Sequence, residues 1–163
     1  MSSTGVQVFD KTLQTSSVWL SEIMDEMAWK DRHMAYVILR AVLHALRDRL
    51  MAEEAVDLGA QLPMLVRGLY YEGWRPAGKP LRYRHKAEFL ERLGRELPAM
   101  DEAQLERSTR AVFKVLADHV TRGEITQVIA QLPAEVRAYW PREFAAAATQ
   151  AAHGEQGDPA PRQ

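Results

Sequence analysis

The chain has 163 residues, of which 47% are hydrophobic and 26% are charged, and its formal net charge at pH 7 is −1. This composition excludes an intrinsically disordered protein, and the balanced charge excludes the strongly basic profile of a general duplex-DNA binder. The sequence contains no cysteine, which rules out disulfides, thiolate metal ligands and cysteine nucleophiles and is typical of a reducing compartment.

A long first helix is predicted from the spacing of its apolar residues, and we expect Thr15-Ser16-Ser17 to start or kink it. The residues on its apolar stripe are Phe9, Leu13, Leu20, Ile23, Met24 and Met27. Such spacing places the side chains on one face of a helix, which is typical of a helix that packs on a core.

Three further helices are predicted in the first half. Asp31 is expected to cap a second helix that reaches Leu50, and the wide apolar face of this helix predicts a central, buried position. A third helix over 52–61 should stop before Pro63, because proline disfavours helical geometry at the residue before it. Proline suits the first turn of a helix, so a fourth helix is predicted over 63–71.

The second half repeats the first at a spacing of 70 residues. When 40–67 is aligned with 110–137, 12 of 28 positions are identical, against about two expected for unrelated segments. The pattern predicts an all-α protein with two tandem four-helix modules that share one core, and a single domain over 1–150. Module one covers about 8–72, a linker 72–83 and module two about 83–141, and residues 151–163 are predicted to form a disordered tail. The identical positions in the first copy are Arg40, Ala41, Val42, Leu46, Asp48, Glu54, Ala60, Gln61, Leu62, Pro63, Val66 and Arg67.

The repeat also predicts details of the second module. Asp101 should cap a helix as Asp31 does, and Pro133 should open a final helix that carries Val136, Tyr139 and Trp140.

Residues retained in both copies are better explained by packing than by one active site. Asp48 and Arg67 recur as Asp118 and Arg137, and we expect an ion pair or a helix cap between these elements.

Several motifs resemble a bacterial family catalogued as domain of unknown function 2267. They are Phe9-Asp10, Trp19-Leu20-Ser21-Glu22-Ile23, the segment 40–50, Gln61-Leu62-Pro63 and Tyr70-Tyr71-Glu72-Gly73-Trp74, and the resemblance covers about residues 8–141. The resemblance implies a small, soluble, all-helical bacterial protein. It carries over no catalytic or ligand residues, because the family has no established activity.

The predicted linker and its flanks supply the candidate binding residues, in which aromatic side chains precede cations. Planar guanidinium groups recognise phosphate and aromatic faces stack on bases, so this segment is a candidate site for an anion, a nucleotide or single-stranded nucleic acid. The alternative is structural: the aromatic side chains only pack at the interface between the modules, and the cations are solvated. The residues are Tyr70, Tyr71, Trp74, Arg75, Lys79, Arg82, Arg84, His85 and Lys86.

No catalytic residue, metal site or cofactor is predicted. His44 and Asp48 lie four residues apart on one helical face, but two ligands do not make a stable metal site. The sequence has no G-x-S-x-G elbow, phosphate loop or dinucleotide fingerprint, which argues against an enzyme. Residues 1–5 do not begin a secretory signal and no apolar run is long enough to span a membrane, so a cytoplasmic location is expected.

The function that these observations favour is a non-catalytic protein-interaction or regulatory module. A groove between the modules or an exposed apolar stripe would then bind a helix of an unknown protein partner. Anion, nucleotide or single-stranded nucleic-acid binding at the linker is the first alternative, and a small-molecule enzyme with a site at the module seam is the second. A homodimer is expected if the first or last helix leaves an apolar face uncovered.

Overall fold

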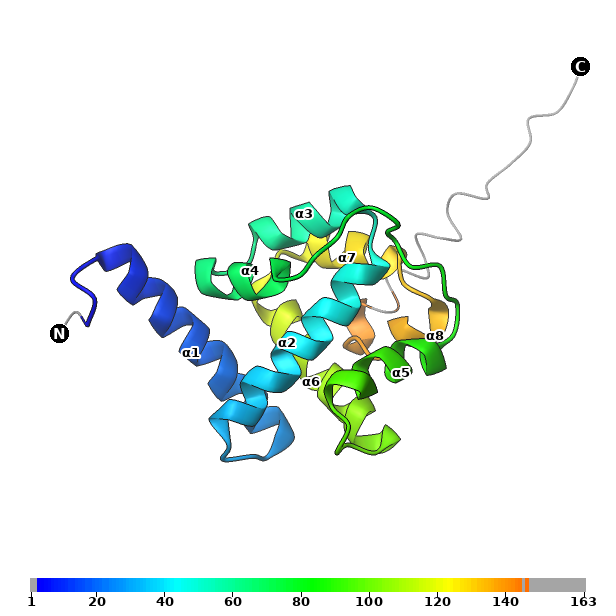
Figure 1. Ribbon diagram of the computed structural model, residues 1–163, viewed down its shortest axis with the longest axis horizontal. Coiled ribbons are helices and arrows are strands. Elements are labelled where there is room, and N and C mark those ends of the chain that lie inside the picture. The colour runs from blue at the N-terminus through cyan, green and yellow to red at the C-terminus, as the bar shows by residue number, and fades with distance from the viewer. Residues whose placement is uncertain (1–2, 145, 147–163) are drawn as a thin grey trace, which may run out of the picture.

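The computed structural model describes residues 3–144 and 146. Within them the backbone is mainly helical and forms no β-strand, which confirms the predicted all-α class. Helix α1 extends from one end of the molecule, and the other helices pack into one body (Figure 1). The helices are α1 (Gln7–Met27), α2 (Arg32–Arg49), α3 (Ala52–Ala60), α4 (Met64–Tyr71), α5 (Lys86–Glu96), α6 (Glu102–His119), α7 (Arg122–Ala130) and α8 (Ala134–Arg137). The predicted tail, 151–163, lies outside the described residues.

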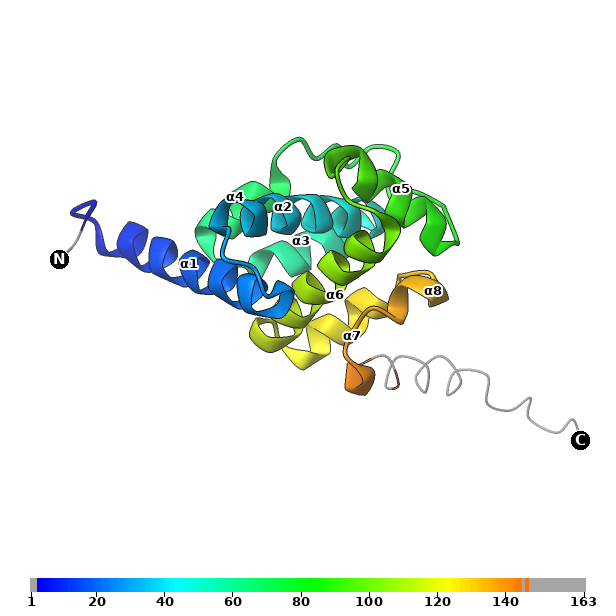
Figure 2. The ribbon, with the colours of Figure 1, turned by 90° about the horizontal axis from the view of Figure 1, so that it is seen from below.

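Only the carboxyl-terminal half of α1 is covered by the rest of the protein. Trp19, Ile23 and Met27 are buried there, whereas Phe9 is 51% exposed in the half that extends outward (Figure 2). The helix begins at Gln7, so the prediction that it starts at Thr15-Ser16-Ser17 is wrong. It ends where Ala28 adopts a left-handed conformation, with φ of 54°, that lets its N–H bond to the Asp25 carbonyl.

Helices α2 and α6 are the central pair, and each has 18 residues. The Asp31 carboxylate accepts a hydrogen bond from the Met34 N–H at 3.1 Å, which confirms the predicted cap of α2. At α6, Asp101 accepts from the Gln104 N–H and the Gln104 side chain accepts from the Asp101 N–H, which completes a capping box. Both predicted caps are therefore present.

Helices α3 and α7 are joined by two hydrogen bonds that mirror each other. The Gln131 side-chain oxygen accepts from the Met51 N–H at 2.8 Å, and the Gln61 side-chain oxygen accepts from the Thr121 N–H at 2.9 Å. Each glutamine lies at the end of one helix and each N–H at the start of the other. The two helices are therefore antiparallel neighbours, and each supplies a partner for an otherwise unpaired N–H of the other.

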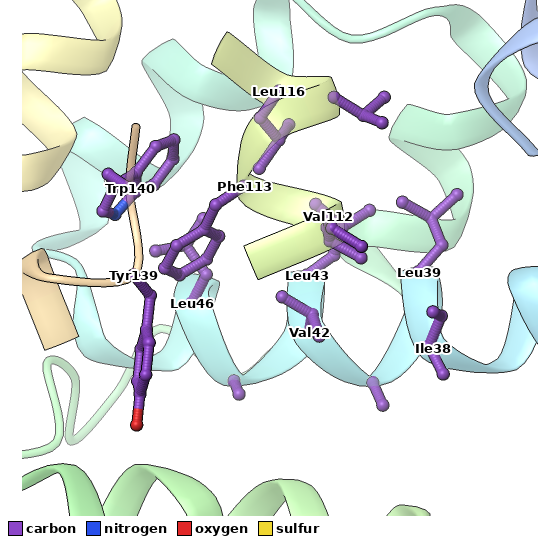
Figure 3. Close-up of a cluster of buried hydrophobic side chains, with 14 of the residues drawn as sticks. Ile38, Leu39, Val42, Leu43, Leu46, Val112, Phe113, Leu116, Tyr139 and Trp140 are labelled. Carbon is purple, nitrogen blue, oxygen red and sulfur yellow. The ribbon is translucent and has the colours of Figure 1, made fainter. Parts of the chain in front are cut away.

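One cluster of buried side chains draws on both halves of the sequence. Leu46 of α2 and Phe113 of α6 lie beside Trp140 in its centre (Figure 3). The predicted final helix is shorter than expected, because α8 ends at Arg137. Tyr139 and Trp140 follow it in a turn and bury their rings, and Pro141 disfavours helical geometry at the residue before it.

Arg67 caps the carboxyl end of α3 and does not pair with Asp48. Its guanidinium donates to the carbonyls of Gly59 at 2.8 Å and Leu62 at 2.9 Å. Arg137 donates in the same manner to Leu132 at 2.8 Å. The predicted pairing of Asp48 with Arg67 is wrong: Asp48 bonds to Arg47 and Arg92, and the cap that Arg67 forms belongs to α3, where a guanidinium satisfies the unpaired carbonyls at the helix end.

Candidate functional site

The aromatic residues of the predicted site pack against helix α3. Tyr70 is fully buried, and its hydroxyl donates to the Ala55 carbonyl at 2.7 Å. Burial raises the pKa of Tyr70 above its ordinary value. The ring centroids of Tyr70 and Tyr71 are 5.0 Å apart, and those of Tyr71 and Trp74 are 5.5 Å apart. A β-carbon at Gly59 would overlap the Tyr71 ring, so a larger residue there would require this ring to shift.

The last two basic residues of the predicted site contact the second half of the chain. The Glu135 carboxylate lies 3.3 Å from Nδ1 of His85 and accepts from the Lys86 N–H at 3.0 Å. These two contacts lower the pKa of Glu135, the backbone hydrogen bond most. The Lys86 ammonium is 3.8 Å from the Glu106 carboxylate. Both residues thus help to attach the start of α5 to the helices that follow it.

Four cations of the predicted site have no such contacts. The side chains of Arg75, Lys79, Arg82 and Arg84 form no hydrogen bond or ion pair with any residue that the structure describes. The three arginines are exposed and Lys79 is half-buried. The structure therefore divides the predicted site into packed aromatic residues, two paired cations and four unpaired ones.

A network of charged side chains connects α2, α4 and α5 beside the linker. The Asp48 carboxylate accepts from Arg47 at 2.9 Å and from Arg92 at 2.8 Å. Arg47 also donates to the carbonyls of Tyr70 at 2.8 Å and Glu72 at 2.9 Å. Asp48 and Arg47 are both buried, so each neutralises a charge that has little access to water.

His44 lies in a polar pocket of about 220 Å³ next to this network. Its Nε2–H donates to the Leu69 carbonyl at 2.8 Å, while Nδ1 is 4.0 Å from the Glu96 carboxylate. Burial is the main cause that lowers the pKa of His44. Both oxygens of Asp48 are held by arginines, so the two residues do not converge on a common point.

An apolar hollow beside the exposed half of α1 was not predicted as a binding site. It has a volume of about 650 Å³ and lies between α1, α2 and α4, and we call it the α1–α4 groove. Glu72 is the one charged residue in its lining. The lining residues are Thr4, Phe9, Thr12, Leu13, Ser16, Leu20, Tyr36, Leu39, Met64, Leu65, Val66, Gly68, Leu69 and Glu72.

One hydrogen bond joins two residues that line the α1–α4 groove. The Thr12 hydroxyl accepts from the Leu65 N–H at 3.0 Å, which attaches the first turn of α4 to α1. The Ser16 hydroxyl is buried without a hydrogen-bond partner in the described residues. The sequence did contain a signal for this groove, because Phe9 and Leu13 belong to the predicted apolar stripe. What the stripe does not reveal is that nothing in the described chain covers them.

None of the described helices combines the length and the apolar character needed to cross a membrane. Comparison with curated proteins gives no match. The family model described as an uncharacterized conserved protein, DUF2267, matches residues 17–139, which confirms the resemblance found in the motifs, and the chain therefore belongs to this family.

Proposed function

We propose that this protein is a non-catalytic interaction module whose α1–α4 groove holds an apolar helix of a partner protein. The observation that carries the proposal is the exposure of large apolar side chains around this one groove. Phe9 is 51% exposed, Leu65 50%, Met64 49% and Leu13 43%. Exposed apolar side chains that gather at one place on the surface are typical of sites that bind another chain.

The spacing of residues along α1 supports a helix as the occupant. Phe9, Leu13, Ser16 and Leu20 line the groove and follow one another in steps of four, three and four residues. That spacing is the seam pattern by which two helices interlock side chains. Since Glu72 is the one charged residue of the lining, the occupant's contacting face is expected to be uncharged.

Site-specific crosslinking tests the proposal. A photoreactive amino acid at Leu65 is expected to crosslink in the host cell to the apolar face of a helix in another protein, identified residue by residue by mass spectrometry. The substitution Leu13→Glu should abolish the crosslink, because it places a second negative charge in a groove whose lining is otherwise apolar apart from Glu72 and a few hydroxyl groups. Leu13 is 43% exposed, so thermal unfolding should show that the variant remains folded.

The same photoreactive residue at Val56 is the matched control. Val56 is 48% exposed but lies on α3, outside the α1–α4 groove, and its crosslinks should not respond to Leu13→Glu. Crosslinks from Leu65 to a second copy of this chain would show that the groove binds another copy in a homodimer and not a different protein. Crosslinks that persist in Leu13→Glu would contradict the proposal.

An internal duplication is part of the proposal for the scaffold. Helices α2 and α6 begin 70 residues apart, as do α3 and α7, and the two glutamine contacts between α3 and α7 involve corresponding residues of the two halves. Two modules of four helices that share one core account for these correspondences. In this arrangement the α1–α4 groove belongs to module one alone.

Anion or single-stranded nucleic-acid binding is a second candidate function, favoured by the unpaired cations Arg75, Lys79, Arg82 and Arg84. Neutralising the last three together is expected to abolish binding of a fluorescent oligonucleotide, and wild-type binding should weaken steeply as salt rises. Fluorescence anisotropy measures both effects. Binding that does not depend on salt would exclude this candidate.

A further inference from the structure

Three acidic side chains meet between α3 and α7. Glu54 and Glu124 occupy the third position of α3 and of α7, and Asp57 lies one turn beyond Glu54. One carboxylate oxygen from each of the three lies within 4.8 Å of those of the other two. Glu54 and Glu124 are each 8% exposed, whereas Asp57 faces solvent. Two of the three carboxylates are therefore placed where an isolated negative charge is unfavourable.

No cationic side chain among the described residues forms an ion pair with this acidic cluster. The three acids face one another: the Glu54 carboxyl group lies within hydrogen-bonding reach of Glu124, and Asp57 adds a further negative charge beside them. Tyr70 and Tyr71 of α4 are near the cluster, and the Tyr70 hydroxyl is already bonded to the Ala55 carbonyl.

Two buried oxygens in the cluster receive no hydrogen bond from a donor in the described residues. Oε1 of Glu54 and Oε1 of Glu124 are both inaccessible to water and form no hydrogen bond with any described residue. Buried carboxylate oxygens normally accept hydrogen bonds or bind a cation, because leaving them unpaired is unfavourable. The unpaired oxygens are therefore a second reason to expect a cation here, separate from the grouping of three acidic residues.

We propose that Glu54, Asp57 and Glu124 form a binding site for a divalent cation of the calcium type. Three points no more than 4.8 Å apart all lie within about 2.8 Å of one central point, close to the roughly 2.3–2.6 Å at which Ca²⁺ holds oxygen ligands. Mg²⁺ needs shorter bonds of about 2.1 Å and a stricter geometry, and Zn²⁺ prefers nitrogen and sulfur ligands. Water reaches the exposed side of Asp57 and completes the coordination. The ion would clamp α3 to α7, and thus one half of the chain to the other.

Metal titrations on the full chain, freed of metal with a chelator, test the proposal. Ca²⁺ is expected to raise the melting temperature of the wild type by several degrees, because it binds the folded state alone. Tb³⁺, a luminescent substitute for Ca²⁺, should bind the same site and be sensitised by the neighbouring Tyr70. Glu124→Gln and Asp57→Asn should each lower the binding affinity for both ions by about tenfold or more.

Glu53→Gln is the matched control, since Glu53 is an exposed acid in the same turn of α3 and is not part of the cluster. Its metal response should equal that of the wild type. Asp57→Asn keeps the test valid if Glu124→Gln folds poorly, because Asp57 lies on the surface. A melting temperature that does not respond to Ca²⁺, Mn²⁺ or Mg²⁺ would overturn the proposal. The two glutamates would then be neutralised by a shared proton, and Glu124→Gln would raise stability at alkaline pH with no metal present.

Discussion

Replacing Asp48 with alanine is expected to lower the free energy of unfolding by about 3 kcal/mol, because it leaves two guanidinium groups without their carboxylate. Arg47 is 4% exposed and cannot turn to water without disturbing its bonds to the carbonyls of Tyr70 and Glu72. Arg92 has a side chain that is 33% exposed and recovers part of its hydration, which places the loss near the lower end of the range for buried pairs. Urea unfolding, followed by circular dichroism, measures the difference.

Asp118 provides the control for Asp48, since it is the corresponding residue of the second half. It is exposed and pairs with Lys114 one turn earlier on the same helix, at 3.0 Å. Asp118→Ala should therefore change stability by no more than about 0.5 kcal/mol. Equal effects of the two substitutions would show that the contacts with Arg47 and Arg92 do not stabilise the fold.

The contrast between Asp48 and Asp118 shows what the repeat could and could not predict. Local features transferred well: Asp31 and Asp101 both cap helices, and Arg67 and Arg137 both close the ends of short helices. Each of these roles involves atoms only a few residues away, so the local sequence is sufficient to predict it. Asp48 instead bonds to an arginine 44 residues away, and only the packing of α5 on α2 brings them together.

The candidate sites were missed for the same reason. The stripe through Phe9 and Leu13 predicts an apolar helix face, but the sequence does not show that the body of the protein covers only the carboxyl-terminal half of α1. Glu54 and Glu124 are identical in the two halves, which was visible in the alignment. Their proximity depends on the antiparallel contact of α3 with α7, which neither segment encodes alone.

The predicted linker site was defined by residue type, and the structure separates its members by their surroundings. Tyr70 is fully buried and its hydroxyl is bonded to the Ala55 carbonyl, whereas Arg82 faces solvent without a partner among the described residues. Aromatic and basic side chains that are neighbours in sequence are thus not neighbours in one site. Whether the unpaired cations bind an anion stays a prediction.

Replacing Phe113 with alanine is expected to lower the free energy of unfolding by about 3–5 kcal/mol, the range typical of a phenylalanine removed from a closely packed core. Phe113 is fully buried, and its ring stacks on Trp140 with centroids 4.1 Å apart and an interplanar angle of 15°. Phe89 lies on another side at 6.3 Å. The cavity would therefore open inside the buried cluster that both halves of the chain share (Figure 3).

Two further variants make the Phe113 result specific. Phe113→Leu keeps most of the side-chain volume and should lower the free energy of unfolding by about 1–1.5 kcal/mol. This variant is expected to fold even if Phe113→Ala does not. Phe9→Ala removes the same ring from a position that is 51% exposed and should cost about 1 kcal/mol or less. Urea unfolding, followed by the fluorescence of the four tryptophans, measures the stability of each variant. A loss at Phe113 no larger than that at Phe9 would mean that the packing around Phe113 does not stabilise the shared core.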